Sequence, residues 1–170
     1  MNYIDRNINL VSLILNNNML RGKQAEKIIR SINKVQTLQH LSLSHNFLGQ
    51  KHNCNQPPVC LLTNLLIGSN YIQHLDVSYN QVDAQSLYCL CFALSMSQSI
   101  SYVSVEANPI GLVGIRLLMN ANNTNPHTEF RINSKNCGSE IDAATDSSVK
   151  LFNMKNPEGP YKLDLTRAYD

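Results

Sequence analysis

The sequence predicts an α/β repeat fold, in which short parallel strands alternate with helices along the chain. Three observations predict it. Four nine-residue segments have aliphatic residues at the first, fourth and sixth positions and Asn at the ninth; they span residues 10–18, 38–46, 72–80 and 100–108. The first and third intervals between successive Asn positions, 18 to 46 and 80 to 108, are equal, and the middle interval is longer by six, which indicates one insertion in a regular period. Apolar residues four apart follow the segments, and this is the spacing of one helical face.

Each nine-residue segment begins as a strand. In 41–43 and 75–77, apolar residues alternate with a polar residue, so one face of the strand is buried. The ninth-position Asn comes where the chain leaves the strand. A buried turn has backbone groups without a sheet partner, and a short side-chain amide both donates and accepts hydrogen bonds. Stacked repeats are therefore expected to align Asn18, Asn46, Asn80 and Asn108 in a ladder.

Helices are predicted between the strands by a second set of apolar positions, ten and fourteen residues after the Asn. These positions hold Ile28 and Ile32, Leu90 and Leu94, and, counted back from Ile72 across the insertion, Leu62 and Leu66. Each pair lies on one helical face, which is expected to pack against the strands. After Asn108 the same offsets give Leu118 and the polar Asn122, which predicts that the fourth helix ends early.

The repeat pattern divides the chain at residue 126. Residues 1–126 hold about four repeats, and residues 127–170 are expected to form a degenerate fifth strand followed by a C-terminal cap or extension. In the fifth strand Phe130 and Ile132 face inward, one residue short of the period. A short helix at 141–152 and a strand at 161–165 are expected beyond it. Because a solenoid normally carries caps, and few residues precede the first repeat, we expect more sequence outside these 170 residues.

The nine-residue motif is that of a leucine-rich repeat. A period of this length with a full helix resembles the ribonuclease-inhibitor-like class of these repeats, over residues 8–122. The resemblance implies a right-handed α/β solenoid with parallel strands on the concave face and helices on the convex face. It implies no single function, because this class hosts many. Residues 156–165 are also similar to tails that follow such repeats in large proteins of unicellular eukaryotes, which implies a fragment of a larger protist or ciliary protein.

Composition argues against several classes of function. The 170 residues carry a net charge of +2 without a basic or acidic run, which disfavours binding to nucleic acid or to a charged membrane surface. No apolar stretch approaches the length of a transmembrane helix, and the first residues do not open a signal peptide. The odd number of cysteines, five, and the missing signal favour a reducing, cytoplasmic compartment.

Residues 52–60, where the insertion falls, contain two of the cysteines. With His52, the thiols of Cys54 and Cys60 suit a metal or redox loop; the alternative is a proline-containing surface loop with incidental thiols. The alternative is favoured, because a zinc site needs four ligands. Cys89 and Cys91 diverge on a predicted helix and are poor partners for a disulfide or a shared metal. We therefore expect no metal and no cofactor.

The motif also predicts which side chains point outward from the concave face. The partner-binding residues expected among them are His40, His74, Asp76, Tyr79, Tyr102 and Glu106. Tyr79 and Tyr102 are the expected anchors, because Tyr offers a large contact area and a hydroxyl at little entropic cost. His40 and His74 are expected to be neighbours, with Asp76 close by. A metal site or an acid–base pair there is disfavoured, because an open sheet lacks the walls that hold ligands.

These observations predict a non-catalytic module that binds other proteins within a larger assembly, such as a ciliary axoneme or a cytoskeletal complex. No phosphate-binding loop or nucleophile–base set is placed by motif, so no enzymatic activity is expected. The alternatives are an enzyme regulator of the GTPase-activating type and the repeat region of a sensor protein. Binding through the convex helices, in place of the concave strands, also stays open.

Overall fold

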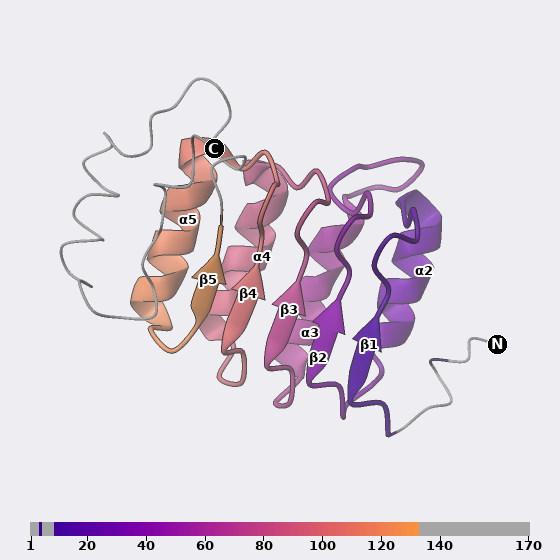
Figure 1. Ribbon diagram of the computed structural model, residues 1–170, viewed down its shortest axis with the longest axis horizontal. Helices are drawn as coiled ribbons and strands as arrows, with labels where there is room; N and C mark the ends of the chain where they lie inside the picture. Colours follow the sequence, from indigo (N-terminus) through magenta and orange to yellow (C-terminus); the bar gives the residue numbers. More distant parts are fainter. Residues whose placement is uncertain (1–3, 5–8, 133–170) are drawn as a thin grey trace.

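The computed structural model describes Ile4 and residues 9–132, which form one open sheet covered by helices on a single side (Figure 1). The strands have three residues each: β1 (Ser12–Ile14), β2 (His40–Ser42), β3 (His74–Asp76), β4 (Tyr102–Ser104) and β5 (Glu129–Arg131). Between them lie α2 (Gly22–Ile32), the 3-10 helix η1 (Pro58–Leu61), α3 (Leu62–Gly68), α4 (Ala84–Met96) and α5 (Gly111–Thr124).

All five strands are parallel and pair in chain order, β1-β2-β3-β4-β5. In Figure 1 the helices lie behind the sheet and each strand lies to the left of the one before it, so the crossovers are right-handed. The strands pair in register, with Leu41 opposite Leu75 and Leu75 opposite Val103. This arrangement confirms the predicted α/β solenoid. We call the side of the sheet that faces away from the helices the concave face.

The hydrophobic core lies between the sheet and the helices. From the strand segments it takes the fourth and sixth residues of the motif, which are buried at Leu41, Leu43, Leu75, Val77, Val103 and Val105. From the helices it takes the buried residues Ile32, Leu62, Leu66, Leu90, Leu94 and Leu118, all of which the spacing predicted. Each fully buried aliphatic side chain stabilises the fold by about 1.5–3 kcal/mol relative to an exposed one.

Two details of the predicted helices were wrong. In α2 the buried positions are Ala25, Ile29 and Ile32, whereas Ile28 is only partly buried. At about 100° per residue the stripe through Ala25, Ile29 and Ile32 faces the sheet, and Ile28 falls at its edge. The predicted early end of the fourth helix is also wrong, because α5 continues to Thr124 and Asn122 is buried within it.

The fifth strand keeps its inward-facing residues despite the shortened period. Phe130 pairs with Val103 and packs against the core, and Ile132 is buried. The period is one residue shorter here because the loop before the strand is shorter. Residues 125–128 join α5 to β5, whereas residues 97–101 join α4 to β4. The helix and strand predicted at 141–152 and 161–165 lie outside the described residues.

Buried Asn side chains connect the turns of neighbouring repeats. The Nδ2 of Asn80 donates to the carbonyl of Leu43 in the preceding repeat at 2.8 Å and to those of Val77 and Ser78 in its own. Its Oδ1 accepts from the backbone N–H of Leu48 at 3.2 Å. One amide thus satisfies donors and acceptors in two repeats, which is why a short amide side chain is needed at this position.

The same arrangement recurs on both sides of Asn80. The Oδ1 of Asn46 accepts from the N–H groups of Asn18 and Leu20, and that of Asn108 accepts from the N–H groups of Asn80 and Val82. Asn18 differs, because it is exposed and its Nδ2 bonds to the carbonyl of Asn16 within its own turn. The described residues hold no repeat before it to which it can bond.

The residue just before each of these Asn residues adopts a left-handed backbone conformation. The φ angles are 58° at Asn17, 55° at His45, 54° at Tyr79 and 51° at Ala107. This conformation costs roughly 1–2 kcal/mol for a residue other than glycine, although Asn adopts it more readily. The tight turn therefore depends on the hydrogen bonds of the adjacent Asn side chain. The nine-residue motif did not predict this left-handed conformation.

We expect the substitution Asn80→Ala to lower the free energy of unfolding by about 1–3 kcal/mol, because it leaves buried backbone groups without partners. Urea denaturation of the full chain measures this change. Asn18→Ala is the matched control, and we expect it to change stability by less than about 0.5 kcal/mol at an exposed position. Equal effects of the two substitutions would show that the ladder does not stabilise the fold.

Candidate functional site

Three rings lie in contact across the concave face at the start of the strands. His40, His74 and Tyr102 are the first residues of β2, β3 and β4, and they pair in register. The ring centroids of His40 and His74 lie 4.6 Å apart, and those of His74 and Tyr102 lie 5.5 Å apart. We call these three residues the strand-start row. The structure thus brings together three of the residues expected at a partner-binding surface.

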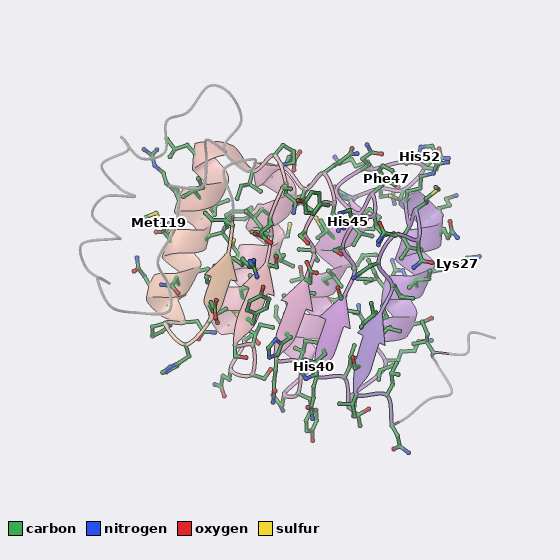
Figure 2. All side chains as sticks on the ribbon, viewed as in Figure 1. Lys27, His40, His45, Phe47, His52 and Met119 are labelled. Carbon is green, nitrogen blue, oxygen red and sulfur yellow. The ribbon has the colours of Figure 1, made fainter. Side chains whose placement is uncertain are left out.

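A second pair of rings lies where the chain leaves the strands. His45 and Tyr79 stack with their centroids 4.2 Å apart and their planes 11° from parallel. Both residues have the left-handed backbone, which directs their side chains toward each other across neighbouring repeats. Tyr79 remains 40% exposed. We call these two residues the strand-exit pair. Figure 2 shows His40 and His45 at opposite ends of β2.

Polar side chains fill the space between the two sets of rings. The carboxylate of Asp76 accepts from the hydroxyl of Ser42 at 3.1 Å and from the backbone N–H of Ser78 at 2.9 Å. The hydroxyl of Ser42 also lies 2.7 Å from the Oδ1 of Asn16, so the network spans three repeats. Asp76 is therefore bonded along the sheet. The charged groups that shift the pKa of His74 are His40 and Glu129, and Asp76 is not one of them.

Tyr102 and Glu106 are held by a residue of the fifth strand. The guanidinium of Arg131 pairs with the Glu106 carboxylate at 3.3 Å and hydrogen-bonds to the Tyr102 side chain. The bond to Tyr102 and then the charge of Glu106 raise the pKa of Arg131. These contacts orient the Tyr102 ring at one end of the strand-start row. The ion pair with Arg131 also balances the negative charge of Glu106, which is one of the expected binding residues.

A shallow depression of about 310 Å³ lies over the first strands of the concave face. Its lining includes the strand-start row together with Ser12, Ile14 and Asp76. Ile14 is 69% exposed and contributes an apolar edge on β1. Apolar and ring surfaces beside a polar network suit contact with a protein side chain.

The sequence predictions missed an apolar surface on the convex side. Tyr88, Phe92 and Met96 lie four residues apart along α4 and are 61%, 55% and 57% exposed. We call these three residues the α4 ridge. They lie two residues from the core positions Leu90 and Leu94, which places them on the opposite side of the helix. The four-residue spacing that predicted the core residues of α4 also places these three apolar residues on one outward-facing stripe.

The cysteines of the insertion do not pair with each other as a metal or redox loop requires. The Sγ of Cys54 donates to the carbonyls of Lys51 and Gln56 within its own loop, at 3.3 and 2.9 Å. Cys60 instead contacts Cys89 of α4. Among the described residues, no group of three His, Cys, Asp or Glu side chains is placed to hold a metal ion. None of the described helices is long and apolar enough to span a membrane.

We expect His74 to titrate below the ordinary histidine pKa of 6.5, because burial and the neighbouring charge of His40 lower its pKa. Between 6.5 and this lowered pKa the unfolded chain binds the proton more readily than the folded chain. The free energy of unfolding should therefore decrease as the pH falls through that window. NMR titration of the imidazole protons measures the pKa. His40→Gln should raise it; an unchanged value would mean that the two rings do not meet in solution.

Comparison with known protein families supports the repeat pattern found in the sequence. A family model described as a leucine-rich repeat matches residues 68–91, which run from the end of α3 through β3 into α4. Comparison with curated proteins found no match. The matched segment is one strand–helix unit, and units on both sides of it have the same register and the same Asn bonding. Residues 68–91 are therefore a leucine-rich repeat, and the neighbouring units of the described chain have the same architecture.

Proposed function

We propose that the chain is a non-catalytic module that binds another protein through its concave face, within a multi-subunit assembly. Leucine-rich repeats generally act as interaction modules, and solenoids bind partners along such extended surfaces. The observation that carries the proposal is the set of rings in contact on this face, formed by the strand-start row and the strand-exit pair.

Pre-stacked rings favour binding because little side-chain freedom remains to be lost. Immobilising a flexible side chain on binding costs about 0.5–1.5 kcal/mol. Tyr79 is held by His45 and by its left-handed turn, and Tyr102 by His74 and Arg131. Both tyrosines thus present a rigid surface at opposite ends of the strands. Tyrosine is also among the residue types that contribute most to protein–protein binding.

The polar contacts between the rings favour recognition over chemistry. A general base needs a carboxylate or imidazole free to reach a substrate proton. The carboxylate of Asp76 is bonded to Ser42 and Ser78, and His40 and His74 contact each other on an open sheet. These features support a binding surface whose polar centre orients the partner.

We place the assembly in the cytoplasm, in a ciliary or cytoskeletal setting. The support is the similarity of residues 156–165 to tails of ciliary proteins; these residues lie outside the described part of the chain. The alternatives are a GTPase-activating regulator and the repeat region of a sensor. A hydrolysis assay with a panel of GTPases tests the first alternative: stimulated GTP hydrolysis would favour it, and unchanged rates across the panel would count against it.

The double substitution Tyr79→Ala with Tyr102→Ala tests the concave face. Loss of two anchors, at about 2 kcal/mol each, should weaken partner binding at least about 100-fold while thermal unfolding stays nearly unchanged. Ala107 has the left-handed backbone in the next repeat, so alanine is accepted at the position of Tyr79. The measurement is capture of partners from a native lysate, followed by titration of the purified partner.

The matched control is Tyr88→Ala with Phe92→Ala, which removes two exposed rings from the α4 ridge on the convex side. We expect this variant to retain binding. Loss of the partner by the convex variant, with binding retained by the concave variant, would assign the interaction to the helices and overturn the proposal.

A further inference from the structure

A second cavity, of about 280 Å³, lies between the insertion and the start of α4. Its lining includes Lys51, Pro57 and Cys60 from the insertion side and Asp83 and Cys89 from the next repeat. The cavity therefore joins two repeats at the place where the six extra residues enter the chain. It lies apart from the ring-bearing residues of the concave face, none of which lines it.

Two thiols meet in this cavity. Cys60 belongs to η1 and Cys89 to α4, both are partly buried, and both line the same cavity. The Sγ of Cys60 also lies 3.9 Å from the carbonyl oxygen of Ser86, one helical turn before Cys89. Cys60 thus lies over the first turns of α4. Packing between η1 and α4 brings the two residues to one cavity, although they belong to successive repeats of the chain.

The other described cysteines have different surroundings. Cys91 is buried in the core and faces away from the cavity lining, and Cys54 donates to carbonyls of its own loop. Of the four described cysteines, Cys60 and Cys89 are therefore the two placed to react with one another. The sequence pairs Cys60 with Cys54, which lies close to it in the chain, whereas the structure places Cys60 beside Cys89 of the following repeat.

We propose that Cys60 and Cys89 form an oxidation site that closes to an intramolecular disulfide when the protein meets a hydroperoxide. The disulfide would link the insertion to α4 and so join two neighbouring repeats covalently. This inference is independent of the proposed function, because it concerns residues outside the concave face.

The reaction proceeds in two balanced steps. One thiol attacks an oxygen of the hydroperoxide; the O–O bond breaks, a sulfenic acid forms, and an alcohol, or water from hydrogen peroxide, is released. The second thiol then attacks the sulfenic sulfur; the S–S bond forms, the S–O bond breaks, and the hydroxide leaves with the thiol proton as water. The two thiols together lose two electrons, which reduce the peroxide.

The surroundings of Cys60 slow its own reaction with an oxidant. Burial, the contact with Cys89 and the charge of Asp83 raise the pKa of Cys60 to about 12, against the opposing charge of Lys51. The thiolate is the reactive form of cysteine, so the protonated Cys60 is a weak nucleophile at neutral pH, and Cys89 is the thiol that attacks the hydroperoxide first. Because Cys60 and Cys89 line one cavity between packed helices, the second step needs only a local rearrangement.

The experiment oxidises the reduced full chain with hydrogen peroxide, blocks the remaining thiols with a maleimide, and digests it with trypsin and an Asp-specific protease. These enzymes release residues 52–75 and 83–116 as separate peptides. We expect mass spectrometry to find these two peptides joined by a disulfide, with the mass of two hydrogens lost. Closing this loop should also raise the melting temperature by about 5–10 °C, reversibly with a thiol reductant.

Single substitutions identify the two sulfurs. Cys60→Ser and Cys89→Ser should each abolish the linked peptides, whereas Cys54→Ser and Cys91→Ala should retain them. Oxidation in urea is a further control, because loss of the fold should give mixed pairings in place of one. Recovery of Cys60 and Cys89 as maleimide adducts after peroxide treatment, or a link that survives Cys60→Ser, would overturn the proposal.

Discussion

Strands of three residues supply few backbone hydrogen bonds, and the buried Asn side chains supply the bonds that the strands lack. The side chain of each buried ladder Asn accepts from a backbone N–H of the preceding repeat and donates to a carbonyl of that repeat and to carbonyls of its own repeat. These residues are Asn46, Asn80 and Asn108. An unsatisfied buried polar group costs about 1–3 kcal/mol, so this position tolerates few other side chains. The stacking distance and the register of the repeats both depend on this contact.

The register in turn decides what the concave face presents. Because His40, His74 and Tyr102 begin paired strands, their rings meet across the sheet without any further contact being needed. The turn next to each Asn then places His45 and Tyr79 in contact through a left-handed backbone. A structural requirement of the repeat thus also arranges the proposed binding residues, and the strain at Tyr79 is offset by the bonds of Asn80.

The six-residue insertion shows how a repeat can vary without loss of the fold. It lies before η1 and leaves the buried positions of α3 and β3 in phase. The extra residues form one wall of the cavity that contains Cys60 and Cys89. The α4 ridge is a second departure from a plain repeat, because α4 has large apolar side chains on both its inner and its outer side. Both features belong to the convex side and are separate from the rings of the concave face.

The sequence by itself determined the repeat, the parallel strands, their buried residues and the columns of outward-facing side chains, because all of these follow from short periodic patterns. It also identified the Asn positions, since a polar residue recurring beside aliphatic ones needs a structural reason. Only the tertiary structure decided that Ile29, not Ile28, faces the sheet, that α5 continues past Asn122, and that Cys60 meets Cys89. These outcomes depend on contacts between segments that lie a full repeat apart in the chain, which local spacing does not encode.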